Sequence, residues 1–252
     1  MGICLKSLHQ DNDLDTSIQF KEVERIPIDE PNKFLVKFIL LGTIKINTTN
    51  APIEMEVIHV DTIDSTMPAS REYIDQGNKL PFIYNTKIQT HGKGKGNRKW
   101  AGSIEGNIYT SSSIPNNMIK NELNANDVLV KITAISIIQQ LRTFDKDEFF
   151  LKYPNDILCK DKKKLGGIIA EHYKDFCIIG FGINIVDKPE QNEIRKEGLQ
   201  PCYVNAHLSK IKKKPDALEL SIEVTKQIIY NLGLTRKEID ELFERYIKKE
   251  NE

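Results

Sequence analysis

The stretch from His91 to Trp100, HGKGKGNRKW, combines residue types that could bind an anion. Three glycines alternate with two lysines, and Arg98, Lys99 and the only tryptophan of the chain follow. Glycine lets the backbone adopt positive φ and approach a ligand closely, while lysine adds positive charge. Between Lys87 and Ile104 there are five Lys or Arg residues and no Asp or Glu, although the whole chain has no net charge. We therefore expect a loop that binds phosphate or carboxylate, with an ordinary surface turn as the alternative.

Three further segments carry residue types that suit a ligand site. Asp64-Ser65-Thr66 combines a carboxylate with two hydroxyls just before a predicted helix, which any of the three could cap. Lys152-Tyr153-Pro154-Asn155-Asp156 ends a predicted strand with an amide and a carboxylate, which could hold a magnesium ion or a ribose. Lys164-Leu165-Gly166-Gly167-Ile168 begins a strand with a lysine and leaves room for a ligand at its glycines. Each segment also has an ordinary interpretation, as a helix cap, a turn and a solvent-facing lysine.

Apolar patterns, turn residues and capping residues predict the elements that hold these segments. Gly77 is typical of a helix C-terminus, so a helix is predicted from Met67 to Gln76. Asn126 is predicted to cap a long buried helix that ends near Phe144. The predicted strands are one or two within Phe34–Ile46, then Met55–Val60, Leu80–Gln89, Asn107–Ser111, Phe149–Tyr153, and an antiparallel meander of Ile157–Lys160, Leu165–Tyr173 and Phe176–Phe181 with a turn at Lys174-Asp175. The predicted C-terminal helices are Asp216–Leu232 and one that a capping box opens at Thr235 and Glu238.

Composition excludes several classes of function. Lys plus Arg and Asp plus Glu both number 36, so no overall field attracts nucleic acid or an anionic membrane. No apolar run reaches the roughly 18 residues of a membrane-spanning helix. Cys4, Cys159, Cys177 and Cys202 are far apart and form no C-x-x-C pair, which argues against a zinc site and against a disulfide framework. We therefore expect a protein of a reducing compartment, with no membrane and no nucleic-acid partner.

Together the motifs resemble the catalytic domain of biotin protein ligases, over about residues 52 to 247. The family's loop is commonly G-R-G-R followed by a tryptophan, and its later motifs are K-W-P-N-D and K-x-x-G-I. Here lysines replace both loop arginines, and Tyr153 replaces the usual tryptophan. Lysine lacks the bidentate fork of arginine, so the loop is expected to hold its ligand less tightly.

The resemblance implies a fold class and a domain organisation. The implied fold is α/β of the α+β type, a mixed and largely antiparallel sheet flanked by helices, like class II aminoacyl-tRNA synthetases. The implied domains are an N-terminal extension of unknown role at residues 1–50 and a catalytic domain at residues 51–252. We expect no SH3-like domain after it and no DNA-binding winged helix before it.

The resemblance also implies an activity with its substrates and partners. Biotin and Mg-ATP would first give biotinyl-5′-adenylate, which would then acylate a lysine of a biotin carboxyl carrier domain. That domain would belong to acetyl-CoA carboxylase or to another biotin-dependent carboxylase. ATP and Mg²⁺ are thus expected as cofactors and biotin as substrate. The location is expected to be cytoplasmic, with an organelle left open, and a homodimer is also left open.

Residue roles follow from the resemblance, position by position. Lys164 and Lys95 would be catalytic, and Asp156 would bind Mg²⁺. The residues that would bind biotin, beginning with the ureido ring at the two hydroxyls, are Ser65, Thr66, Gln89, Gly92, Lys93, Gly94, Lys95 and Gly167. Those that would bind ATP and the adenylate are Lys93, Lys95, Trp100, Asn155, Lys164 and Asn184.

Two other functions remain open at this level. A lipoate or octanoate protein ligase would use the same acyl-adenylate chemistry, and pocket shape cannot be read from sequence. A non-catalytic binder of single-stranded nucleic acid would use the cationic loop and Trp100. Zero net charge, and a lysine motif at Lys164 outside that loop, argue against the second alternative.

Overall fold

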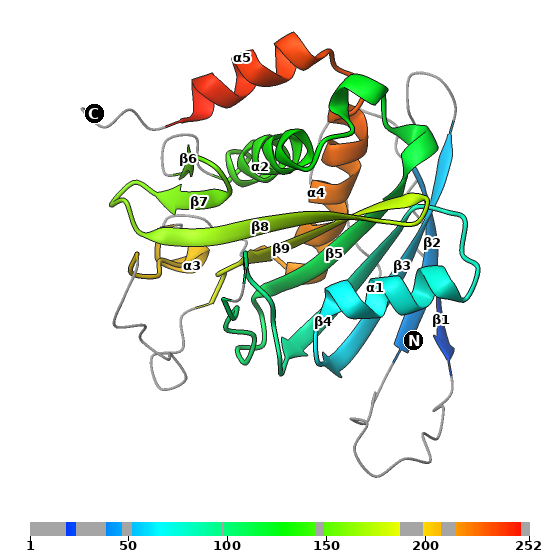
Figure 1. Ribbon diagram of the computed structural model, residues 1–252. Coiled ribbons are helices and arrows are strands. Elements are labelled where there is room, and N and C mark those ends of the chain that lie inside the picture. The colour runs from blue at the N-terminus through cyan, green and yellow to red at the C-terminus, as the bar shows by residue number, and fades with distance from the viewer. Residues whose placement is uncertain are drawn as a thin grey trace.

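The computed structural model describes residues 19–23, 39–46, 52–96, 98–144, 149–186, 199–207 and 215–247. Its centre is a nine-stranded sheet with the spatial order β1-β2-β3-β4-β5-β9-β8-β7-β6 (Figure 1). The strands are β1 (Gln19–Val23), β2 (Ile39–Ile46), β3 (Ile53–Ile63), β4 (Phe82–Gln89), β5 (Ile108–Pro115), β6 (Phe149–Lys152), β7 (Asp156–Cys159), β8 (Lys164–Tyr173) and β9 (Phe176–Ile183).

All neighbouring strands pair antiparallel except β3 and β4, which are parallel. Parallel neighbours need a crossover, and the helix α1 (Thr66–Asp75) supplies it. Gly77 follows this helix with φ +94°, as predicted for its C-terminus. The predicted meander is also present as β7, β8 and β9, with Lys174 at φ +50° in its turn. The mixed, largely antiparallel sheet is therefore as expected.

Helices cover both faces of the sheet (Figure 1). The larger core lies beneath α2 (Asn126–Leu141), α4 (Ala217–Asn231) and α5 (Arg236–Tyr246), and a smaller core lies beneath α1. Neighbouring residues alternate between the two cores, as Phe82 and Ile83 do on β4, because successive strand side chains point to opposite faces. The 3₁₀ turns Asn116–Met118 and Asn121–Leu123 precede α2, and the short helix α3 (Val204–His207) follows β9.

Several sequence predictions need adjustment at the ends of elements. The N-cap of α2 is Ala125, so the prediction that Asn126 caps this helix is wrong by one residue. Asp216 caps α4, and Thr235 with Glu238 forms the predicted capping box of α5. Strand β1 was not predicted, and it pairs with β2, which in turn pairs with β3, so the described part of residues 1–50 extends the sheet. Residues 34–38 of the strand prediction lie outside the described residues.

The expectation about the cysteines is also wrong for one pair. Cys159 and Cys202 form a disulfide across 43 residues of sequence, while Cys177 stays a buried free thiol. The sequence offers no close pair because the neighbourhood is created by tertiary structure, which lays the chain before α3 alongside the start of β8. Of the described helices, none has both the length and the apolar character needed to cross a bilayer.

Candidate ligand-binding cleft

The glycine-rich loop folds as a short hairpin between β4 and β5. The N–H of Trp100 donates to the Gly92 carbonyl (2.8 Å), and the N–H of Gly94 donates to the Arg98 carbonyl (2.8 Å). Gly96 sits near the tip with φ +66°, a conformation that side chains disfavour. A Cβ at Gly92 would lie 2.6 Å from the Trp100 carbonyl oxygen, so the two arms approach too closely for any other residue. Gly92 and Gly96 are therefore positions where the loop requires glycine, as the sequence predicts.

The Asp64 side chain holds the start of this hairpin in place. Its carboxylate accepts hydrogen bonds from the Thr90 hydroxyl and from His91 Nδ1 (3.0 Å), and its carbonyl accepts from the His91 N–H (2.8 Å). These hydrogen bonds, the one from Thr90 first, hold the pKa of the Asp64 carboxyl below its ordinary value. The loop is therefore tied to the chain just before α1.

A cluster of buried polar side chains, Thr66, Gln89 and Ser111, forms one end of the cleft. Gln89 Oε1 accepts from the Thr66 N–H (2.9 Å) and from Thr66 Oγ1 (3.3 Å), and the Ser111 hydroxyl donates to Thr66 Oγ1 (2.7 Å). Ser65 is the N-cap of α1 in extended conformation, yet its side chain makes no capping hydrogen bond. Its hydroxyl therefore remains available at the cleft, which Ser65 lines.

Lys164 forms the other end of the cleft. Its Nζ lies 2.6 Å from Asp156 Oδ1 and 5.6 Å from the centre of the Trp100 ring. Lys164 and Asp156 start neighbouring strands, and the Asn155 side chain donates to the Ile168 carbonyl (3.1 Å), which fixes the turn before β7. The ammonium group is thus held between a carboxylate and the indole face.

Gly167 and Gly182 form the floor of the cleft between these two ends. Asp156, Gly167 and Gly182 are register partners across β7, β8 and β9, so the two glycines sit side by side. Trp100 lies on them: a Cβ on Gly182 would come within 2.4 Å of the indole, and one on Gly167 within 3.1 Å. Trp100 Nε1 is buried without a hydrogen-bond partner among the described residues, so a donor is left for a ligand.

Most of the predicted site residues meet in this cleft. Its lining includes Ser65, Thr66, Gln89, Lys93, Gly94, Lys95, Trp100, Asn155, Lys164 and Gly167. Three predicted residues do not line it: Gly92 lies within the hairpin, Asp156 holds Lys164, and Asn184 donates from Nδ2 to the Lys164 carbonyl (3.4 Å). Their predicted contacts with ligand or metal therefore stay predictions.

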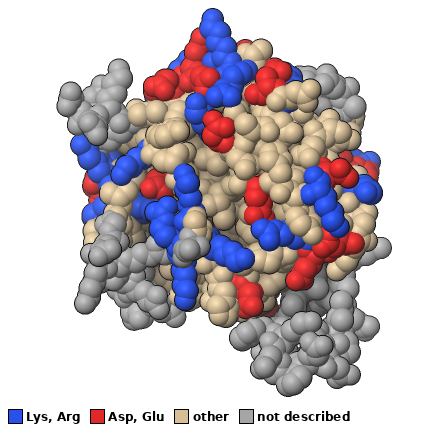
Figure 2. Space-filling model, viewed as in Figure 1, with Lys and Arg blue, Asp and Glu red and all other residues tan. Residues whose placement is uncertain are grey.

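Other residues of the cleft were not predicted as site residues. The assigned site residues did not include Thr110, Ser111 or the apolar residues Met67, Ile168, Ile169 and Phe181, and Arg98 and Lys99 were counted only with the cationic loop. The run Ser111-Ser112-Ser113, inside an otherwise apolar strand, was a signal that could have revealed the polar end. Figure 2 shows Lys and Arg side chains gathered on the face that carries the loop. The lining contains five Lys or Arg residues and no Asp or Glu among the described residues, so the cleft suits an anion.

Solved biotin protein ligases share this fold. The ligase from Leishmania major in complex with biotin has a TM-score of 0.68 at 24% identity, covering 76% of this chain and 81% of that chain. The ligase from Aquifex aeolicus in complex with biotin and ATP has a TM-score of 0.62 at 27% identity, covering 76% and 78%. The predicted fold class, that of the biotin and lipoate ligases with its likeness to class II synthetases, is confirmed.

The sequence identifies the family more closely. Residues 60–184 match the biotin/lipoate A/B protein ligase family, and this part of the chain belongs to it. The biotin--[acetyl-CoA-carboxylase] ligase of Mycobacterium tuberculosis is 29% identical over 106 residues, which is 41% of this chain and 39% of that protein. The bifunctional ligase/repressor BirA of Bacillus subtilis is 29% identical over 138 residues, which is 53% and 41%. The chain thus spans only 39% and 41% of the length of these relatives.

Proposed function

We propose that this protein is an ATP-dependent biotin protein ligase. It forms biotinyl-5′-adenylate and then transfers biotin to a lysine of a carrier domain of a biotin-dependent carboxylase, such as acetyl-CoA carboxylase. One observation carries the proposal. The lysines of the glycine-rich hairpin and Lys164, which come from distant segments, line one cleft together with a buried polar group that could hold the biotin ring.

The polar end offers the hydrogen bonds that a ureido ring needs. Thr66, Ser111 and Gln89 already form a network, and the Ser65 hydroxyl is not used by the helix. A ring with one carbonyl and two N–H groups needs both donors and acceptors, which hydroxyls provide. The biotin carboxylate would then extend along the cleft towards the loop lysines.

The cationic groups of the cleft would lower the barrier of the first step, the formation of the adenylate. Attack of a carboxylate on the α-phosphate brings two anions together, so fixed positive charges at the reacting centre lower the barrier. Lys93 and Lys95 have no acidic partner among the described residues, and the Lys164 ammonium is held in place by Asp156. In the second step, the hairpin would shield the acyl-adenylate from water until the acceptor lysine arrives.

The described residues do not form a cage for Mg²⁺. None of the described cleft-lining residues is acidic, and Asp156 is paired with Lys164. The one group with metal-ligand spacing in the described part of the chain is Cys159, Asp161 and Cys202, whose sulfurs are joined in the disulfide. Magnesium would instead enter as the ATP complex, held mainly by the phosphates.

Biotin-dependent exchange of labelled pyrophosphate into ATP tests the first step. The proposal requires exchange with biotin, and an acceptor domain should then become biotinylated, whereas its Lys→Arg variant should not. Exchange with lipoate or octanoate but not with biotin would replace the proposal by the related ligase activity. Salt-sensitive RNA binding without any exchange would favour the nucleic-acid binder instead.

Location and assembly belong to the same proposal. A cytoplasmic enzyme that needs neither membrane nor nucleic acid fits the described helices and the balanced charge. A homodimer is compatible with the proposal, and sedimentation of the purified protein with and without biotin and ATP would determine its oligomeric state.

A further inference from the structure

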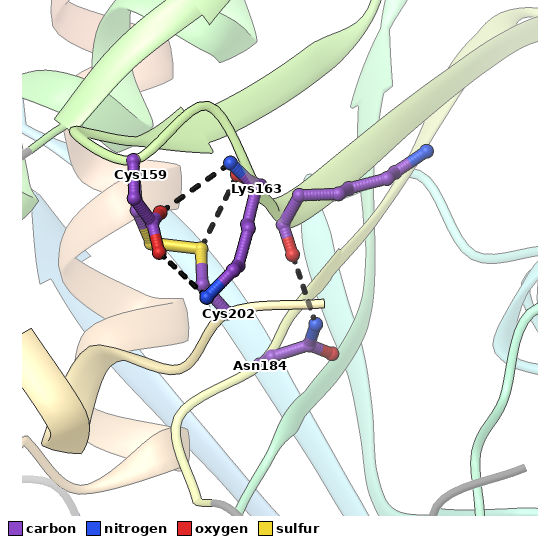
Figure 3. The surroundings of a disulfide bond; sticks show 6 residues. Cys159, Lys163, Asn184 and Cys202 are labelled. Carbon is purple, nitrogen blue, oxygen red and sulfur yellow. Dashed lines mark hydrogen bonds and ion pairs between the residues drawn. A yellow bond between two sulfur atoms is a disulfide. The ribbon is translucent and has the colours of Figure 1, made fainter. Parts of the chain in front are cut away.

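The Cys159–Cys202 disulfide lies beside Lys163, the residue that precedes Lys164 of the cleft (Figure 3). Cys159 ends β7, and its N–H donates to the Lys163 carbonyl (3.0 Å) across the turn that leads to Lys164. Cys202 Sγ lies 3.3 Å from the same carbonyl oxygen. The disulfide therefore contacts the residue just before Lys164.

The partner cysteine belongs to a segment, residues 199–205, that brackets Lys164. The Lys164 N–H donates to the Gln200 carbonyl (2.7 Å), and the Cys202 N–H donates to the Lys164 carbonyl (2.9 Å). Both hydrogen-bonding groups of the Lys164 backbone are thus satisfied by this one segment. An isolated parallel pairing between Lys164 and Pro201 completes the contact.

The same segment also holds Asn184. The Val204 N–H donates to the Asn184 carbonyl (3.0 Å), and Asn184 Nδ2 donates to the Lys164 carbonyl (3.4 Å). Segment 199–205 therefore ties the start of β8 to the end of β9 through a few hydrogen bonds. Each hydrogen bond alone is weak, so a covalent link adds most to the persistence of this arrangement.

We infer that the Cys159–Cys202 disulfide positions Lys164 and Asn184 for adenylate formation, and that its reduction slows this step. The inference rests on the proposed function, because it concerns the same cleft. Cys159 and Cys202 act here as positioning residues through the Lys164 backbone. Biotin binding should be spared, since Thr66, Gln89 and Ser111 form the polar end of the cleft and their hydrogen bonds there are made to one another rather than to the segment.

The redox step involves only these two sulfurs and a dithiol reductant. The reductant supplies two electrons and two protons, the S–S bond breaks, and the reductant becomes its own disulfide. Cys159 and Cys202 are 0% and 4% exposed, so attack requires segment 199–205 to lift from β8. Burial raises the pKa of the Cys177 thiol to about 12, so this third cysteine stays protonated and inert. In a reducing compartment such a pair would respond to redox state.

The test compares oxidised, reduced and reoxidised full-length protein. After treatment with dithiothreitol, alkylation and peptide mapping should show free thiols at Cys159 and Cys202. Pyrophosphate exchange should fall roughly 10- to 100-fold, as expected for a misplaced reacting group. The biotin Kd from calorimetry should change by less than about twofold, because removing only transition-state contacts lowers kcat without weakening ground-state binding. Reoxidation should restore the exchange rate.

Variants provide matched controls. Cys159→Ser and Cys202→Ser should show the reduced-state rate and no response to dithiothreitol, whereas Cys177→Ala should respond as the wild type does. If the serine variants fail to fold, titration of the wild-type protein with reductant decides alone. Unchanged exchange after mapped reduction overturns the inference, and so does a parallel loss of biotin affinity and thermal stability, which would indicate a merely structural bond. Absence of exchange in the oxidised protein would instead refute the proposed function.

Discussion

The position of Gln89 predicts two separable roles in the cleft, one in stability and one in ligand binding, and a pair of substitutions distinguishes them. Its Oε1 accepts hydrogen bonds from the backbone and side chain of Thr66, while its amide nitrogen lies near Gly92 of the hairpin. Gln89→Met removes both functions at similar size. Gln89→Glu keeps an acceptor for Thr66 but replaces the amide donor by a negative charge.

The expected loss of stability follows from the buried donor that methionine would leave unpaired. Thr66 and Gln89 are 3% and 8% exposed, so the Thr66 N–H at the first turn of α1 would have no access to water. Leaving such a group unsatisfied costs about 1–3 kcal/mol, and each kcal/mol lowers Tm by roughly 2–4 °C in a chain of this size. Gln89→Glu should avoid this loss because a carboxylate is also a good partner for a helix N-terminus.

Biotin binding should be weakened by Gln89→Glu, the variant that is expected to leave stability nearly unchanged. The glutamate would face the anion that the cleft is proposed to bind, so Gln89→Glu should weaken biotin binding at least about tenfold at nearly unchanged Tm. Thermal melts and calorimetry with biotin measure the two effects on the same samples. A wild-type Tm for Gln89→Met, or a wild-type biotin Kd for Gln89→Glu, would refute the assigned roles.

Three further outcomes are expected. Lys164→Ala should reduce biotin-dependent pyrophosphate exchange by about 100-fold or more while biotin still binds, whereas the adjacent exposed Lys163→Ala should not; a normal exchange rate in Lys164→Ala would reject its role. Gly182→Ala should push the indole of Trp100 off the floor, since the new Cβ would lie 2.4 Å from it, and the emission of this single tryptophan should change. Burial lowers the pKa of His59 below 6.5 in the folded protein, so the unfolded chain takes up the proton first as the pH falls. The free energy of unfolding should therefore decrease as the pH drops from 6.5 towards the folded pKa, by at most about 1.4 kcal/mol per pH unit. Urea titrations should show a weaker pH dependence of this free energy in His59→Asn.

The elements that could be predicted are those that local chemistry determines. The capping box at Thr235, the glycine after α1 and the Lys174-Asp175 turn each satisfy backbone groups within a few residues, so sequence order reveals them. The cationic loop was found for the same reason, because its glycines and lysines are neighbours. Its hairpin form is held by hydrogen bonds within the loop and by those of the nearby Gln89 and Asp64.

The parts that could not be predicted depend on distant partners. Strand β5 was predicted to end at Ser111, yet it continues to Pro115. Its buried Thr110 and Ser112 hydroxyls bond to Ser221 and Thr225 of α4, so polar groups that look unfavourable in a strand are satisfied across the core. The disulfide escaped prediction in the same way.

The register of the sheet brings residues from separate sequence motifs together in the cleft. Pairing of β7 with β8 and of β8 with β9 sets Asp156, Gly167 and Gly182 in one row, although 26 residues separate the first from the last. The carboxylate of this row fixes the Lys164 ammonium, and the two glycines leave the floor on which Trp100 lies. A one-residue slip of β8 would move Gly167 off this row and turn its neighbours to the other face. The cleft therefore depends on sheet register as much as on the loop.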